Sequence, residues 1–351
     1  MSGLPLNPVA PDARAAGVAA NVSHDQAMTG RSGGFLPIDV SLLAPGPQRA
    51  FDLYKRVSED TVLLCAKDYP LRQRVLDGLK HLAAHEQYLY IPAEQGPDLS
   101  QHVEKTLHRT LQNSTLDVGR RSGILHASAR AIMADILANP RAPGAFRRGV
   151  GLANATVDFM IEEPGALRSM SALFTKDYYT YTHSVHVCVL GVSLYRYLVS
   201  PNPAILRRMG LGLLLHDAGK SLVDERVLNK NGRLSDAEFE QMKSHPALGW
   251  QVLQEQGADD EMIRQVVLHH HERMDGSGYP EGLQGLRLTE AARVAAVVDV
   301  YDALTTDRPY RQAMTHEAAI TLMAESMVPH HLDQEYFFAF RKMTAASGGR
   351  R

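Results

Sequence analysis

Histidine and aspartate residues recur in the second half of the chain, inside segments that are otherwise dominated by apolar residues. Buried imidazole and carboxylate groups are costly unless they are paired or bind a metal ion. No cysteine accompanies them, and a mixed set of imidazole and carboxylate ligands suits Fe or Mn, with Ni, Co and Zn as alternatives. The pattern therefore predicts a metal centre with seven candidate ligands: His183, His216, Asp217, His245, His270, His271 and Asp299.

This set of ligands is too large for one ion that must also hold water or substrate. It suits two divalent ions with a carboxylate between them, and Asp217 is the expected bridge because its neighbour His216 can hold one of the ions. Lys220 follows three residues later, a spacing that returns to the same face of a helix. We expect its ammonium group to point at the site, where it would stabilise charge on a phosphate undergoing displacement.

The other histidines and the two cysteines are expected to have structural roles. We interpret His186 and His269 as neighbours of the site rather than ligands. The histidines that we place on the surface or in packing contacts are His81, His85, His102, His108, His330 and His331. The two cysteines, Cys65 and Cys188, lie far apart in apolar surroundings and are expected to be buried free thiols.

Composition and charge describe an ordinary globular protein. The 351 residues are 44% hydrophobic and 22% charged, and the net charge of −2 argues against a protein that coats polymeric nucleic acid. The first residues lack the basic start and apolar core of a signal peptide. No apolar run approaches the roughly 18–20 residues that a membrane helix needs. We therefore expect a cytoplasmic protein that does not insert into a membrane.

Composition and periodicity divide the chain into five segments. Residues 1–34 are rich in Ala, Gly, Pro and Ser and are predicted to be a disordered leader. Short strand patterns and two helical patterns over 35–112 predict a small α/β module. Residues 113–165 are predicted to be a helical connector, 166–342 an all-α helical bundle that holds the candidate ligands, and 343–351 a disordered tail. The expected fold class is α+β overall, and Ser235 with Glu238 predicts a capping box at one helix start.

Five motifs between residues 177 and 340 resemble the HD-GYP subgroup of the HD phosphohydrolase superfamily. They are THSVHV, HDAGK, HPALGWQVL, HHERMDGSGYPEGL and DVYDALTTDRPYR. The resemblance implies an all-helical catalytic domain that hydrolyses cyclic di-GMP. In this family a hydroxide held by a metal site opens the cyclic dinucleotide to linear pGpG, and some members continue to GMP.

The resemblance also implies a role for each matched residue. His183, His216, Asp217 and Asp299 would hold one ion, and His245, His270 and His271 would hold the other together with Asp217. Lys220 would contact the scissile phosphate. The remaining substrate contacts would come from Arg308 and Arg311 and from Gly278, Tyr279 and Pro280 in the loop of residues 276–280. Glu272 and Asp275 would hold that loop in place.

One position departs from the pattern of some family members. They carry a glutamate four residues before the first histidine, which helps to recruit a third ion, whereas this chain has Tyr179 there. We therefore expect two ions rather than three. The resemblance further implies that the module over 35–112 is regulatory, although it matches no receiver, PAS or GAF pattern.

Several alternatives stay open. The first is a catalytically weak member that senses cyclic di-GMP or docks partners, such as GGDEF-type signalling proteins, through the loop of residues 276–280. Another is an HD hydrolase that acts on other nucleotides, against which the GYP loop and the RPYR segment both argue. The sequence also leaves open the native metal, the cleavage of pGpG to GMP, the signal that reaches the N-terminal module, and dimerisation.

Overall fold

The computed structural model describes most of the chain from Gly34 onward. The described residues are 34–38, 40, 43, 50–57, 60–85, 89–174, 180–230, 232–307, 312–328 and 330–347. Nearly all of the predicted leader lies outside these ranges, as do Tyr179, Arg308 and Arg311. The predictions made for these residues therefore stay predictions.

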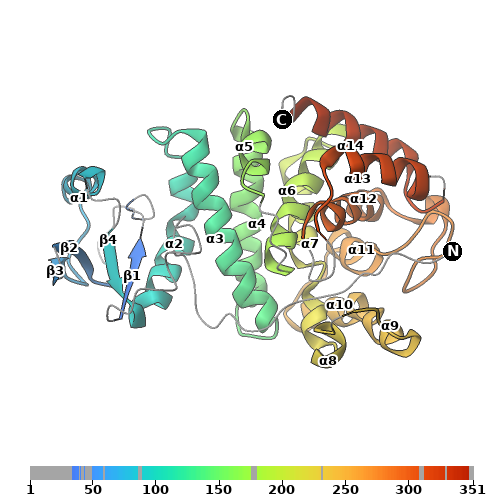
Figure 1. The fold of residues 1–351 in the computed structure, drawn as a ribbon, viewed down its shortest axis with the longest axis horizontal. Helices are drawn as coiled ribbons and strands as arrows, with labels where there is room; N and C mark the ends of the chain where they lie inside the picture. Colours follow the sequence, from blue (N-terminus) through green and yellow to red (C-terminus); the bar gives the residue numbers. More distant parts are fainter. Residues whose placement is uncertain are drawn as a thin grey trace. The chain divides into compact units, whose positions relative to one another are not determined.

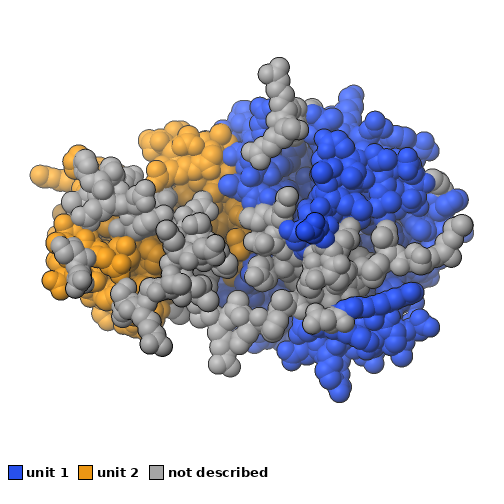
Figure 2. Space-filling view, viewed as in Figure 1, with its two compact units in different colours: residues 1–12, 133–351 blue, residues 13–132 orange. Residues whose placement is uncertain are grey.

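The chain splits into two compact units, one within 13–132 and the other containing 133–351 (Figure 2). The division falls inside helix α3 (Val118–Ala138), which belongs to the segment predicted to connect two domains. The division thus lies inside the predicted connector and not at either of its ends. The boundaries proposed at residues 112 and 165 remain predictions.

The N-terminal unit contains a four-stranded antiparallel sheet with the strand order β1-β4-β2-β3 (Figure 1). Its elements are β1 (Phe35–Ile38), β2 (Leu53–Val57), β3 (Asp60–Cys65), α1 (Gln73–His85), β4 (Leu89–Pro92) and α2 (Gly96–Leu111). Apolar residues of the strands and of α2, such as Ile38, Leu53, Ile91 and Leu99, are fully or almost fully buried. This sheet, followed by a mostly helical chain, confirms the predicted α+β class.

The second unit is helical. Its elements are α4 (Ala145–Glu162), α5 (Ala166–Ser171), α6 (Thr180–Leu198), α7 (Pro203–Leu215), α8 (Glu225–Leu228), α9 (Asp236–Met242), α10 (His245–Glu255), α11 (Glu261–His269), α12 (Glu290–Thr305), α13 (His316–Leu322) and α14 (Gln334–Ser347). Ser235 and Glu238 form the predicted capping box at the start of α9. Helix α14 extends past residue 342, where the helical bundle was predicted to end, because Met343 is buried and continues its apolar face.

Helices α6, α7 and α12 form the centre of this unit, where α6 packs against both α7 and α12, and α7 against α4 and α11. A helix that is apolar on all sides is buried on all sides. Every residue of α7 from Met209 to Leu215 is buried, and most residues of α12 are buried. Polar side chains within these buried stretches therefore lie in the interior rather than at the surface.

A close backbone contact joins α10 to a short 3₁₀ helix that follows α7, η3 (Ala218–Leu222). A Cβ atom added to Gly219 would lie 1.9 Å from the carbonyl oxygen of His245 and 2.5 Å from the nitrogen of Gly249. Both obstacles are backbone atoms, which cannot move aside as the end of a flexible side chain can. Only glycine fits at residue 219 without displacing α10.

Gly219→Ala is therefore expected to lower the free energy of unfolding by about 3 kcal/mol, the upper end of the usual cost of overpacking. Gly151→Ala is the matched control, because Gly151 is an exposed residue of α4 with no heavy atom within 4 Å of an added Cβ. That change should instead stabilise its helix by roughly 0.5–1 kcal/mol. Urea unfolding of the metal-free protein measures both effects, and equal stabilities for the two variants would contradict the contact.

Candidate metal centre

The predicted ligands come from five separate segments and meet in the interior of the helical unit. His183 lies in α6, Asp299 in α12, and His245 is the first residue of α10. His216 and Asp217 follow α7 directly, and His270 and His271 follow α11. All seven are at most 8% exposed. Residues more than 100 positions apart in the sequence thus share one buried space.

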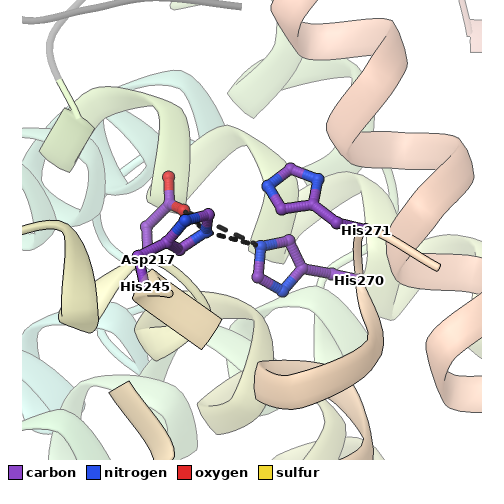
Figure 3. Close-up of side chains that lie close together, drawn as sticks. All are labelled: Asp217, His245, His270 and His271. Atoms are coloured by element: carbon purple, nitrogen blue, oxygen red, sulfur yellow. Dashed lines mark hydrogen bonds and ion pairs between the residues drawn. The ribbon is translucent and has the colours of Figure 1, made fainter. Parts of the chain in front are cut away.

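These side chains form two groups that share one carboxylate. One ligand atom from each of Asp217, His245, His270 and His271 lies within 4.8 Å of the others, and the same holds for His183, His216 and Asp217. Figure 3 shows the first group, in which Asp217 and His245 both face His270. The shared position of Asp217 is the one that the sequence predicted for a bridging carboxylate.

Asp299 lies between the two groups, although it belongs to neither of them by the same distance criterion. Its Oδ1 is 3.0 Å from Nε2 of His183, and its Oδ2 is 3.7 Å from Nδ1 of His271. Each carboxylate oxygen therefore faces a histidine of a different group.

Backbone carbonyl groups fix the orientation of three of the histidines. The last carbonyls of a helix have no partner within that helix, so they can accept a hydrogen bond from a nearby side chain. Since a carbonyl only accepts, the proton lies on Nδ1 and the lone pair of Nε2 points into the site. The Nδ1···O distances are 2.7 Å from His216 to Leu213, 2.8 Å from His245 to Met242 and 2.9 Å from His270 to Val267.

The inward lone pairs face one another rather than donors. Nε2 of His245 lies 3.3 Å from Nε2 of His270, and two acceptor nitrogens at that distance repel each other. Nε2 of His216 and Oδ1 of Asp217 are buried without a hydrogen-bond partner. Buried polar atoms without partners are rare in proteins. A cation between these atoms would satisfy all of them, so the donor set fits a metal ion.

The charge states of the side chains favour the same interpretation. Burial and the charge of Lys220 lower the pKa of His245 to about 4. Burial and neighbouring histidines hold the pKa values of His270 and His271 well below the ordinary range. Although burial raises the pKa of Asp217, the neighbouring His216 and the Lys220 ammonium group outweigh it and hold the pKa well below its usual value. Neutral imidazoles around an ionised carboxylate are the protonation states that a metal ion requires.

Lys220 points at the site, as its spacing predicted. Its Nζ donates to Oδ2 of Asp217 over 2.6 Å, and its side chain is 18% exposed. The segment is a 3₁₀ helix rather than an α-helix, and side chains three residues apart are eclipsed in a 3₁₀ helix. The ammonium group therefore lies at the border between the buried carboxylate and solvent, where an anionic ligand could reach it.

The loop of residues 276–280 lies against the first group, at His271. The Tyr279 ring is 4.9 Å from the ring of His271 between centroids, and the amide of Tyr279 donates to the carbonyl of His271 over 3.4 Å. A Cβ on Gly278 would lie 2.4 Å from backbone atoms of Glu272 and Arg273, so the loop packs directly on the chain that follows the histidines. The Tyr279–Pro280 peptide is cis.

Glu272 and Asp275 hold this loop through hydrogen bonds to backbone amides. The buried carboxylate of Glu272 accepts from Glu281 (2.7 Å) and Leu283 (3.0 Å). Asp275 accepts from the amide and the hydroxyl of Ser277. These contacts are those expected of residues that shape a loop rather than bind a metal.

His269 lies outside the two groups, as predicted, since its Nδ1 is 2.8 Å from Oε1 of Gln265 and its Nε2 is 3.6 Å from Glu281. His186 also lies outside them, stacked on Phe174 with 3.9 Å between ring centroids. Asp302, which the sequence pattern did not indicate as part of the site, contacts Nδ1 of His183 and of His186. Its only signal in the sequence was its spacing of three residues after Asp299, which puts both carboxylates near one face of α12.

Comparison with known proteins identifies a domain that contains most of these residues, although His183 and His186 lie before its first matched residue. Residues 191–336 match the family model of the HD domain. The chain is 45% identical to a cyclic di-GMP phosphodiesterase of Pseudomonas aeruginosa over 183 residues, which are 52% of this chain and 44% of the relative. It is 44% identical to a cyclic di-GMP phosphodiesterase response regulator of Xanthomonas campestris over 112 residues, 31% of this chain and 29% of the relative.

A third relative acts on a different cyclic dinucleotide. It is a 3′3′-cGAMP-specific phosphodiesterase of Vibrio cholerae, 36% identical over 169 residues, 48% of this chain and 36% of the relative. Among solved structures, an HDG"Y"P protein from Bdellovibrio bacteriovorus matches with a TM-score of 0.61 and 20% identity, over 88% of this chain and 99% of that one. At that identity the match shows a shared fold.

The chain therefore carries an HD domain, and its resemblance to HD-GYP phosphodiesterases is confirmed. It spans less than half of the length of the curated relatives that it matches. No helix in the described part of the chain combines the length and the apolar character needed to cross a membrane.

Proposed function

We propose that this protein is a metal-dependent phosphodiesterase that hydrolyses cyclic di-GMP to linear pGpG. The observation that carries the proposal is the pair of buried ligand groups that share Asp217. Two relatives with 44–45% identity over 112 and 183 residues are named as cyclic di-GMP phosphodiesterases, which supports the choice of substrate.

The donor set suits two divalent ions. We assign one to His183, His216, Asp217 and Asp299 and the other to His245, His270, His271 and Asp217. Fe or Mn is the expected metal, with Ni, Co and Zn as alternatives, because the ligands are imidazole and carboxylate without thiolate. When bound, such ions lower the pKa of a coordinated water and neutralise charge that develops on a phosphate. Tyr179, at the position of the third-ion glutamate, supports two ions over three.

The protein's own residues would orient the substrate. The Lys220 ammonium group, at the solvent border of the site, would bind a phosphate oxygen and stabilise the charge that grows there during displacement. Gly278, Tyr279 and Pro280 would line the substrate side of the ligand groups, since Tyr279 lies on His271. Arg308 and Arg311 would bind the second phosphate and a guanine, as bidentate donors suited to both.

A nucleotide assay tests the proposal. The full chain is loaded with Mn²⁺, or with Fe²⁺ under reducing conditions, incubated with cyclic di-GMP, and the nucleotides are separated by chromatography. The expected product is pGpG, and a later GMP peak would show that the enzyme cuts twice. A parallel reaction with 3′3′-cGAMP determines which cyclic dinucleotide is preferred, because one relative is named for that substrate.

The alternative is a protein that binds cyclic di-GMP, or a GGDEF-type partner at the loop of residues 276–280, without cutting. The intact ligand groups and Lys220 argue against it. Binding of cyclic di-GMP without any linear product, in metal-loaded protein, would favour the sensor and contradict the enzyme.

A further inference from the structure

Asp302 joins two histidines of helix α6 from its place on helix α12. Its Oδ2 lies 2.7 Å from Nδ1 of His183, and its Oδ1 lies 3.0 Å from Nδ1 of His186. The hydroxyl of Thr306 donates to Oδ2 over 3.4 Å. Asp302 is 2% exposed, so the carboxylate is held entirely by partners within the protein.

The charge of Asp302 determines which ring nitrogens carry protons. Each of its two oxygens lies within hydrogen-bond distance of one histidine Nδ1 atom, the arrangement of a carboxylate that accepts two hydrogen bonds. An ionised carboxylate can only accept hydrogen bonds. Nδ1 of His183 and Nδ1 of His186 therefore both donate to Asp302. Nε2 of His183 is left facing the metal centre, 3.0 Å from Asp299 and 3.8 Å from Asp217.

The position of His183 in its helix explains why a side chain, rather than a backbone carbonyl, must accept the hydrogen bond from its Nδ1. His216 and His270 lie at helix C-termini, where backbone carbonyls have no partner within the helix and can accept from Nδ1. The carbonyl that accepts from His245 likewise belongs to the last residue of α9. His183 lies in the first turn of α6, where the unsatisfied backbone groups are N–H donors. An acceptor for Nδ1 must therefore come from another element, and Asp302 supplies it.

We propose that Asp302 is the positioning residue of the ion site formed by His183, His216 and Asp217, with His186 as the second donor that holds its carboxylate in place. The inference rests on the metal centre of the proposed function. Asp302 lies on the opposite side of the imidazole from Nε2, so it acts through His183 and does not contact the ion. A carboxylate on the far nitrogen fixes the ring and makes the imidazole a stronger ligand.

The test is a Mn²⁺ titration of the full-length metal-free protein against a chromophoric chelator, without nucleotide. Wild-type protein should bind two ions. Asp302→Asn offers one acceptor and one donor in place of two acceptors, so it can satisfy only one of the two Nδ1–H groups. One of the two ions should bind about 10–100-fold more weakly, while the other, at His245, His270 and His271, keeps its affinity.

Asp333→Asn is the matched control. Asp333 is also largely buried and paired with Arg293 over 2.9 Å, but it lies at the start of α14, outside both ligand groups. Its loss should lower the melting temperature and leave both Mn²⁺ affinities unchanged. If Asp302→Asn also lowered the melting temperature and left both Mn²⁺ affinities unchanged, Asp302 would contribute to stability alone, and the proposal would be overturned.

His186→Ala provides a second variant in case Asp302→Asn does not fold. It removes only the second donor, so the same ion should bind more weakly, by a smaller factor than in Asp302→Asn. Wild-type Mn²⁺ affinities for both ions in this variant would contradict its assigned role. Because binding is measured without nucleotide, a wild-type protein that binds two ions but cuts no cyclic dinucleotide would refute the proposed function and leave this inference standing. A wild-type protein that binds no Mn²⁺ would overturn both.

Discussion

Asp217→Ala is expected to abolish hydrolysis of cyclic di-GMP and to release both ions. Asp217 is the one residue common to the two ligand groups, so its loss leaves each group with histidines alone. It also removes the ionised charge that offsets the positive charge of the metal. Metal ions contribute several kcal/mol to phosphoryl chemistry, so kcat/KM should fall by at least about a thousand-fold, which corresponds to roughly 4 kcal/mol.

Metal content by elemental analysis and hydrolysis by chromatography measure this result together. Asp259→Ala is the control, since Asp259 is an exposed carboxylate outside both groups and its loss should change neither quantity. Circular dichroism confirms that both variants fold. An Asp217→Ala protein that keeps two ions per chain would exclude a bridging role, whatever its activity.

The burial and close approach of the candidate ligands could be predicted, because polar residues within apolar segments indicate burial. His216 and Asp217 directly follow a run of leucines, and Asp299 lies in a run of valines and alanines. Such residues must be satisfied in the interior, and ligation was the one arrangement that satisfied all of them. The capping box of Ser235 could be predicted for a different reason, because its partner Glu238 lies only three residues away in the sequence.

Features that depend on contacts between distant segments could not be predicted in this way. Asp302 and His183 are 119 residues apart, and nothing local indicates that α12 packs against α6 in the register that joins them. The strand order β1-β4-β2-β3 likewise depends on a pairing of β1 with β4 across more than 50 residues. The spacing of Lys220 suggested a shared face with Asp217 but not the 3₁₀ geometry that brings them together.

Lys220→Met is expected to separate catalysis from metal binding. The substitution keeps the length and apolar stem of the side chain and removes only the ammonium group, which donates to Asp217 at the solvent border of the site. Loss of one charged donor to a transition state costs about 10²–10³-fold in kcat. We expect this loss with two ions still bound, because Lys220 carries no metal ligand atom, and with little change in Lys342→Met, an exposed lysine of α14.

The pH of the measurement matters for this variant. The charge of Lys220 lowers the pKa values of His245 and His271, so its removal should raise them toward the ordinary value of about 6.5. Protons would then compete with metal at acidic pH more strongly than in the wild type, and the variant should lose its ions at a higher pH when the pH is lowered. At pH 8 the histidines of both proteins are neutral, so a difference in rate at that pH reports on the contact between Lys220 and the substrate phosphate. If Lys220→Met kept the full wild-type rate at pH 8, Lys220 would have no role in binding the phosphate. Its only role would then be to keep His245 and His271 deprotonated.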